Sequence, residues 1–263
     1  MSRWPIERTL SRGWKRLRGR SPLHTLYLHP DGVWSWCSGA EPATCEGFDA
    51  WCEAHAGNDA RLLLSGHMVH NIVVDASLGL RQDGPLRSYA LQQFVHYHGA
   101  AAQSWPLATW SEGGQSVASA LHAVDWIALR RAAAAHDVIL VGATPVWSAG
   151  LGSLSMWVPE FQSGGRRALA LVEGTLVSWL VVESGRLTAL LQRRLDAPQV
   201  GALADMLVQL VAASQPLTDA PLVVGWGVAD AENAADLPAR VLVLLGTDAV
   251  SGAWVRDHMG PGA

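Results

Sequence analysis

Residues 169–196, LALVEGTLVSWLVVESGRLTALLQRRLD, decide the fold because they hold three apolar runs separated by two short polar turns. The turns are Glu173-Gly174-Thr175 and Glu183-Ser184-Gly185-Arg186. Apolar runs of this length, bounded by glycine-containing turns, predict an antiparallel meander of three strands. A meander of this kind can open a phosphate-binding domain or can be purely structural, and the choice between these interpretations determines what the sequence implies about function.

The composition predicts a well-packed soluble protein. Apolar residues make up 49% of the 263 residues and charged residues only 16%, against roughly 25% charged in typical soluble proteins. No apolar stretch approaches the roughly 20 residues that a membrane-spanning helix needs, and no secretory signal is expected because the N-terminus lacks an apolar h-region. The 13 Trp residues are expected mostly in the core or between lobes. Cys37, Cys45 and Cys52 match no compact zinc pattern and are expected to be reduced thiols in a cytosolic protein.

The N-terminal 21 residues carry a strong positive charge. Seven of the 19 basic residues lie within the first 20 positions, which leaves 12 basic against 22 acidic residues in the remainder. Leu10, Trp14 and Leu17 recur at helical spacing, so residues 3–18 can form a short amphipathic helix. We interpret the segment either as a disordered solubilising tail or as a docking segment for an anionic membrane surface or an acidic partner. The candidate docking residues are Arg8, Arg12, Trp14, Lys15, Arg16, Arg18 and Arg20.

The two halves of the chain show a similar order of expected elements. Each begins with a hairpin or meander and continues with helices and buried strands, which predicts an α/β fold of two RNase H-like lobes, each a mixed sheet with flanking helices. We place the basic tail at 1–21, the first lobe at 22–150 and the second at 151–263, with a Gly- and Ser-rich junction at 148–166. The first half is expected to hold strands at 23–29, 33–37, 61–65, 68–74, 105–110, 115–120 and 138–142, and helices at 48–55, 86–98 and 125–135. The second half is expected to hold the meander, a helix from 196 to 211 and strands at 222–225 and 241–245.

The sequence shows no complete catalytic motif. It lacks the Walker phosphate loop and the dinucleotide-binding glycine pattern. His67 and His70, expected three apart on one strand, would point to opposite faces, and His96 and His98 are poorly spaced on a helix, so no metal site is predicted. An ATP-using lobe needs a turn whose backbone N–H groups cradle phosphate and an acidic residue to hold Mg²⁺-bound water. Glu173-Gly174-Thr175 matches this need only in part, and Pro30 removes a donor from the equivalent hairpin of the first lobe.

Four stretches carry a resemblance to a known family: the helix PLRSYALQQFVHYHG (85–99), the extended WPLATW (105–110), the run VASALHAVDWIALRRAAAAHDVILVGATPVWSAGL (117–151) and the meander. Together with the order of elements, they resemble the actin-like (ASKHA) cytoplasmic domain of the type II secretion protein GspL and its type IV pilus counterpart PilM. The resemblance implies two actin-like lobes that serve as a scaffold at the bacterial inner membrane. Such scaffolds connect a hexameric assembly ATPase to inner-membrane pilus or secretion subunits, and a homodimer is kept as an alternative to a monomer.

Two departures from the family shape the functional expectation. PilM-type members keep the phosphate turns and can bind ATP, whereas this chain lacks them, as GspL-type members do. GspL-type members continue into a membrane helix, whereas this chain stops near residue 263, as a PilM-like subunit would. We therefore expect a non-catalytic scaffold that binds no nucleotide, cytoplasmic and peripheral to the inner membrane. The alternatives are a PilM-type or sugar-kinase-like ATP-binding protein, and an adaptor whose basic tail binds a membrane surface or, although no nucleic-acid motif is present, nucleic acid.

Overall fold

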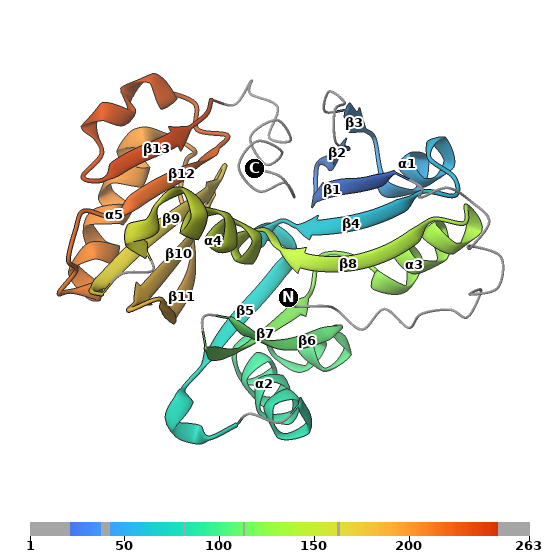
Figure 1. The fold of residues 1–263 in the computed structure, drawn as a ribbon, viewed down its shortest axis with the longest axis horizontal. Coiled ribbons are helices and arrows are strands. Elements are labelled where there is room, and N and C mark those ends of the chain that lie inside the picture. The colour runs from blue at the N-terminus through green and yellow to red at the C-terminus, as the bar shows by residue number, and fades with distance from the viewer. Residues whose placement is uncertain (1–21, 38–42, 81–82, 113, 162–163, 247–263) are drawn as a thin grey trace.

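The computed structural model describes residues 22–37, 43–80, 83–112, 114–161 and 164–246. These residues form two five-stranded sheets on either side of a central helix, with a smaller three-stranded sheet below the junction (Figure 1). The expected α/β class with two mixed-sheet lobes is confirmed. The basic tail and all seven candidate docking residues lie outside the described residues.

The first lobe is built on a sheet with the strand order β3-β2-β1-β4-β8. Strands β1, β2 and β3 are antiparallel neighbours, whereas β4 and β8 extend the sheet parallel to β1. Two short helices precede the parallel strands. The elements are β1 (Leu23–His29), β2 (Gly32–Trp36), β3 (Ala43–Cys45), α1 (Phe48–Ala54), β4 (Asp59–Leu64), α3 (Trp126–Ala135) and β8 (Ile139–Pro145).

The second lobe repeats this arrangement with the strand order β11-β10-β9-β12-β13. The meander of residues 169–196 forms its three antiparallel strands, and β12 and β13 run parallel to β9. β9 therefore corresponds to β1, β12 to β4 and β13 to β8. The elements are β9 (Arg166–Glu173), β10 (Leu176–Glu183), β11 (Arg186–Arg194), α5 (Val200–Ser214), β12 (Leu222–Trp226), the 3₁₀ turn η5 (Ala231–Asp236) and β13 (Arg240–Leu244).

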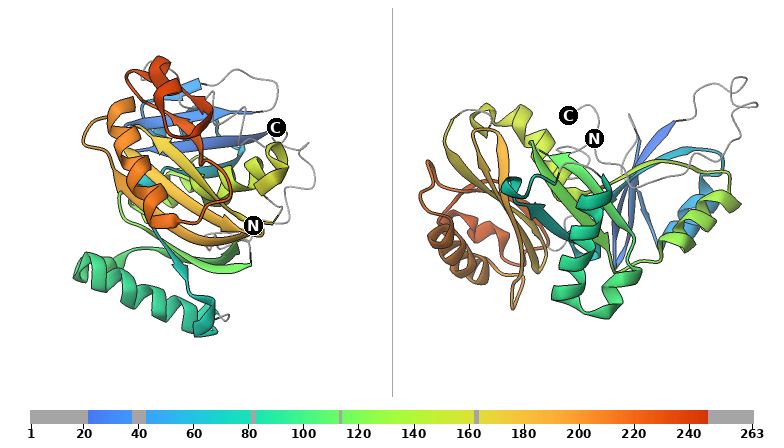
Figure 2. Two further views of the ribbon diagram at one scale, coloured as in Figure 1. Left: turned by 90° about the vertical axis from the view of Figure 1, so that its left-hand side faces the viewer. Right: turned by 90° about the horizontal axis from the view of Figure 1, so that it is seen from below.

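A third sheet, of order β5-β7-β6, is inserted between β4 and α3 of the first lobe. The sequence predicted its strands but not that they leave the main sheet, because a strand's periodicity does not identify its neighbour. Its helix α2 projects away from both large sheets (Figure 2). The elements are η1 (Gly66–Met68), β5 (Val69–Val74), η2 (Ala76–Leu78), α2 (Asp83–His98), η3 (Ala100–Ser104), β6 (Leu107–Glu112) and β7 (Gln115–Leu121).

The junction expected at 148–166 is largely helical. It forms α4 (Val146–Trp157) and η4 (Pro159–Phe161), so the expected lobe boundary at 150/151 falls inside α4. A buried apolar cluster extends from the first lobe through α4 to the second, and it includes Tyr27, Trp147 and Leu180. The lobes therefore share a core.

Strands β9 and β10 of the meander are buried on both faces, which explains their nearly continuous apolar runs, whereas β11 is partly exposed. On β10, Leu180 and Val182 belong to the cluster shared between the lobes, whereas Trp179 and Val181 pack on the other face among residues of α5. The alternation follows the two-residue period of a strand. All Trp residues of the described segments whose side chains are placed are buried or half-buried, as expected from their size.

We predict that Gly225→Ala destabilises the protein by several kcal/mol, because its Cβ would lie 2.2 Å from the carbonyl oxygen of Val172 on β9 and strand backbones cannot separate without losing the ladder. Gly201→Ala is the matched control, since Gly201 is exposed on α5 with no heavy atom within 4 Å of the added carbon. The control should be neutral or stabilise by up to about 1 kcal/mol. Urea unfolding of both variants measures this, and equal stabilities would contradict the close approach.

Candidate functional site at the lobe junction

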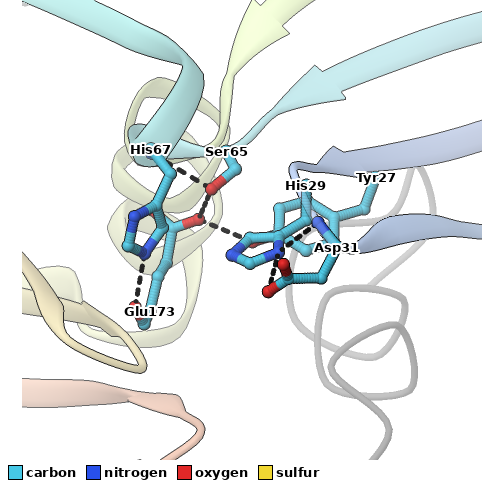
Figure 3. Close-up of polar contacts among 6 residues, drawn as sticks. All are labelled: Tyr27, His29, Asp31, Ser65, His67 and Glu173. Carbon is cyan, nitrogen blue, oxygen red and sulfur yellow. Dashed lines mark hydrogen bonds and ion pairs between the residues drawn. The ribbon is translucent and has the colours of Figure 1, made fainter. Parts of the chain in front are cut away.

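The carboxylate of Glu173 lies at the centre of the junction between the lobes (Figure 3). Glu173 ends β9 in the second lobe, yet all three donors that bind its side chain come from the first. The Tyr27 hydroxyl and the Ser65 hydroxyl donate to Oε1 over 2.6 and 2.8 Å, and the backbone N–H of Gly66 donates to Oε2 over 2.9 Å. Glu173 is 1% exposed, so a buried acidic side chain links the two lobes.

Burial and hydrogen bonding act in opposite directions on the Glu173 carboxyl. Burial raises its pKa because removal from water disfavours the charged form, whereas the bonds from Tyr27, Ser65 and Gly66 lower it. The pKa of the Tyr27 hydroxyl is raised well above its ordinary value by burial and by the neighbouring Glu173. Tyr27 therefore stays protonated and acts as a donor.

Gly66 is required at this position because the neighbouring segments approach closely. A Cβ on Gly66 would lie 2.7 Å from Oε2 of Glu173 and 2.6 Å from Cδ2 of Leu176. The carbonyl oxygen of Gly66 accepts a hydrogen bond of 3.2 Å from Nε2 of Gln192 on β11. Gly66 thus contacts the second lobe through both its N–H and its C=O group.

The first backbone N–H group of the turn after Glu173, that of Gly174, is already hydrogen-bonded within the protein. The N–H of Gly174 donates to the carbonyl oxygen of Trp226 over 2.8 Å. Gly174 adopts the left-handed conformation, with φ of 59°, which glycine tolerates without a steric penalty. The two N–H groups of Gly66 and Gly174, which a phosphate could otherwise approach at this junction, are bound within the protein.

Two histidines border the Glu173 site. Nε2 of His67 donates to the backbone carbonyl oxygen of Glu173 over 2.9 Å, and the His67 ring lies 5.0 Å from that of His29. Burial lowers the pKa of His29 to about 4, and nearby His67 contributes to this, although Asp31 opposes it. The expectation that His67 shares a strand with His70 is wrong, because His67 belongs to η1 and the strand begins at Val69. In the described part of the chain, no group of three or more His, Cys, Asp or Glu side chains gathers to hold a metal ion.

A second polar network joins the third sheet to the rest of the molecule. Asn71 on β5 donates to Oε1 of Gln192 over 3.1 Å, and its own Oδ1 accepts from Nε1 of Trp147 over 3.0 Å and from Ser119. Gln192 in turn binds Gly66. The third sheet, the second lobe and α4 are therefore connected through a chain of satisfied side-chain amides.

A stack of three histidines lies on the third sheet. The His70 ring is 3.9 Å from that of His98 and 4.0 Å from that of His122, with interplanar angles of 17° and 16°, and Trp105 packs against all three. Stacked rings present their faces to one another, so their in-plane nitrogen lone pairs do not converge on one metal ion. Burial, the other histidines and the charge of Arg194 lower the pKa of His70 to about 3.

Sequence reasoning missed the role of Glu173. It considered Glu173 only as part of the turn Glu173-Gly174-Thr175, because the partners Tyr27, Ser65 and Gly66 lie more than 100 positions away along the chain. One signal was available, because Glu173 is an acidic residue at the end of a buried strand. The sequence argued against a shared metal site for His67 with His70 and for His96 with His98, but it did not predict that the rings of His70, His98 and His122 stack on one another.

Comparison with known proteins identifies the architecture. No protein-family model and no curated protein sequence matches the chain. Among solved structures, a Bacteroides thetaiotaomicron protein of unknown function with an actin-like ATPase fold matches with a TM-score of 0.58 and 8% identity, covering 86% of this chain and 91% of that one. The chain has the actin-like fold.

Two further actin-like structures correspond to the resemblance found in the sequence. A PilM–PilN type IV pilus biogenesis complex matches with a TM-score of 0.57 and 11% identity over 92% of this chain and 96% of that one. The cytoplasmic domain of EpsL, an inner-membrane component of the Vibrio cholerae type II secretion system, matches with a TM-score of 0.51 and 11% identity over 90% and 94%. The expected structural likeness to PilM and to the secretion L protein is confirmed.

We predict that Tyr27→Phe lowers the free energy of unfolding by about 1.5–3 kcal/mol, because it removes a hydrogen bond to a buried carboxylate and leaves the other contacts of the ring. Tyr97→Phe is the control, since Tyr97 is 70% exposed on α2 and its hydroxyl can bind water. The control should change stability by less than about 0.5 kcal/mol. Chemical denaturation distinguishes the two, and an equally small effect of both would contradict a stabilising role for the junction.

We also predict that acidification destabilises the protein through its histidines. The pKa values of His70, His122, His29 and His24 are all lowered in the folded chain. Below the ordinary value of 6.5, the unfolded chain therefore binds more protons than the folded one, and stability falls with decreasing pH. The melting temperature should fall by a few degrees between pH 7 and pH 5.

His70→Phe should reduce this pH dependence, because phenylalanine keeps the stacking surface and cannot titrate. His96→Phe, at an exposed position on α2, is the control and should leave the pH dependence unchanged. The raised pKa of Glu173 makes the folded state more stable as the pH falls, opposite to the effect of the histidines. Because Glu173 is present in every variant, its contribution cancels when the variants are compared. A His70→Phe profile parallel to that of wild type would contradict this assignment.

Proposed function

We propose that the protein is a non-catalytic, actin-like scaffold of a type IV pilus or type II secretion assembly platform. It acts in the cytoplasm at the inner membrane and bridges the assembly ATPase and the inner-membrane subunits. The likeness to a PilM–PilN pilus complex and to the cytoplasmic domain of EpsL supports this proposal. None of the described helices is long and apolar enough to cross a membrane. In this proposal the protein docks at the membrane through partner subunits or through the basic segment 1–21.

One observation carries the non-catalytic part of the proposal. Both oxygens of Glu173 accept hydrogen bonds from the first lobe, and the N–H groups of Gly66 and Gly174 are bound within the protein. A nucleotide at this junction would need free N–H groups for its phosphates and a carboxylate free to hold Mg²⁺-bound water. Binding ATP here would first require breaking these buried hydrogen bonds between the lobes, which is costly.

Isothermal titration with Mg-ATP tests the non-catalytic part. We expect no heat of binding when micromolar protein is titrated with ATP up to about 1 mM. Any remaining binding would then be weaker than a Kd of about 1 mM, which corresponds to a binding free energy of about −4.1 kcal/mol. An actin-like protein that binds ATP, titrated in the same buffer, is the positive control. Micromolar binding would contradict the proposal and favour the ATP-binding alternative.

The scaffold part is tested by co-purification of the full chain with the inner-membrane subunits and the assembly ATPase of a pilus or secretion system from the same organism. We expect capture of at least one of each. The absence of every such interaction, with a folded protein, would contradict the scaffold role.

A further inference from the structure

A groove on the outer face of the first lobe has no role in the junction described above. It lies between α1 and α3, which cover the face of the sheet remote from the shared core, and its volume is about 510 Å³. This volume falls within the range of ordinary binding pockets. Its apolar lining consists of Phe48, Val124, Ala128, Leu129, Ala132 and Ala135.

The groove is hollow because of the alanines of α3. Ala128, Ala132 and Ala135 follow one another at spacings of four and three residues, so they lie on one face of the helix. Their short side chains leave a trough above Phe48 of α1. On the same helix, and adjacent in sequence to Ala128, Ile127 is 59% exposed. A row of small residues beside an exposed large apolar one provides space and apolar surface for bulky side chains.

The rim of the groove is mainly acidic. Asp49 and Asp125 line it, opposed by Arg131, and the Asp49 side chain is 82% exposed. Glu46 and Glu53, both exposed, lie just before and on α1. An acidic rim around an apolar trough complements a segment that is both basic and amphipathic.

We propose that this groove binds the N-terminal segment of the same chain, residues 3–18. The segment carries six basic residues against one acidic residue, and its apolar residues Leu10, Trp14 and Leu17 recur at helical spacing. Trp14 supplies the large side chain that the alanine trough can accept. The charge and the size of the segment therefore both match the groove.

The chain that follows the N-terminal segment enters the first lobe near one end of the groove, so the segment can reach the groove. Leu23 begins β1 and lies beside Asp59 of β4, which lies beside Ile139 of β8. Because α3 ends at Ala135, just before Ile139, the chain enters β1 at the end of the sheet where α3 ends. A 16-residue helix would be about 24 Å long, against about 15 Å for the ten residues of α3. The segment can therefore run back along the groove.

Binding in the groove would shield the basic residues from an anionic membrane or an acidic partner. The groove-bound and membrane-bound states of the segment would then compete, and release from the groove would expose the docking residues. This inference is independent of the machine that the protein serves. It holds or fails whether or not the scaffold proposal is correct.

Limited trypsin digestion of the full chain tests the inference, because trypsin cleaves after the Arg and Lys residues of the segment. Cleavage within residues 1–20 is followed by intact mass. At about 50 mM salt we expect wild type to be cleaved about fivefold more slowly than Ala128→Lys, whose charge and bulk block the groove, since cleavage follows the population of the released state. About 0.5 M salt should accelerate wild-type cleavage by weakening the ionic contacts.

Ala134→Lys is the matched control. Ala134 is exposed on the same helix but does not line the groove, so this variant should be cleaved at the wild-type rate. Circular dichroism melts establish that both variants are folded. Equal cleavage of Ala128→Lys and Ala134→Lys, or wild-type cleavage independent of salt, would overturn the inference. If the segment became better protected from trypsin as the protein concentration rises, the inference would also be overturned, because the segment would then bind the groove of a second copy.

Discussion

The burial of the Glu173 carboxylate constrains the junction between the lobes. A charged group removed from water must be hydrogen-bonded, because an unsatisfied buried charge costs more than the fold can supply. Tyr27, Ser65 and Gly66 meet this requirement from the first lobe. Gly66 also begins the short turn that leads into β5. The relative position of the two lobes and the point at which the third sheet leaves the first lobe therefore depend on the same contact.

The same contact argues against nucleotide binding, although the protein has an actin-like fold. An actin-like fold places two hairpin turns near one another, and such a fold is compatible with nucleotide binding or with its loss. In this chain the donors near the second-lobe turn are bound by Trp226 and Glu173, while the first-lobe hairpin carries Pro30 and a His29–Asp31 contact. The junction is thus suited to holding the lobes in one arrangement, which supports the proposed scaffold.

Local patterns predicted most elements, whereas contacts between distant segments were not predictable. The meander, the apolar face of α5 and the Asp125 cap of α3, which accepts from the N–H groups of Ile127 and Ala128, all depend on neighbouring residues. The third sheet was missed because β5 follows β4 after a single turn and nothing in its sequence specifies its pairing with β7. His70, His98 and His122 come from three separate segments, and the partners of Glu173 lie in the other lobe, so no local periodicity could reveal either site.

The central claim is that Glu173 binds the first lobe at the position where a phosphate would approach. A crystal structure of the full chain, grown with saturating Mg²⁺ and a non-hydrolysable ATP analogue, tests it most directly. The account predicts Glu173 bound to Tyr27, Ser65 and Gly66, with no nucleotide between the lobes. Nucleotide density at the junction, with the Glu173 carboxylate displaced from Gly66, would contradict it.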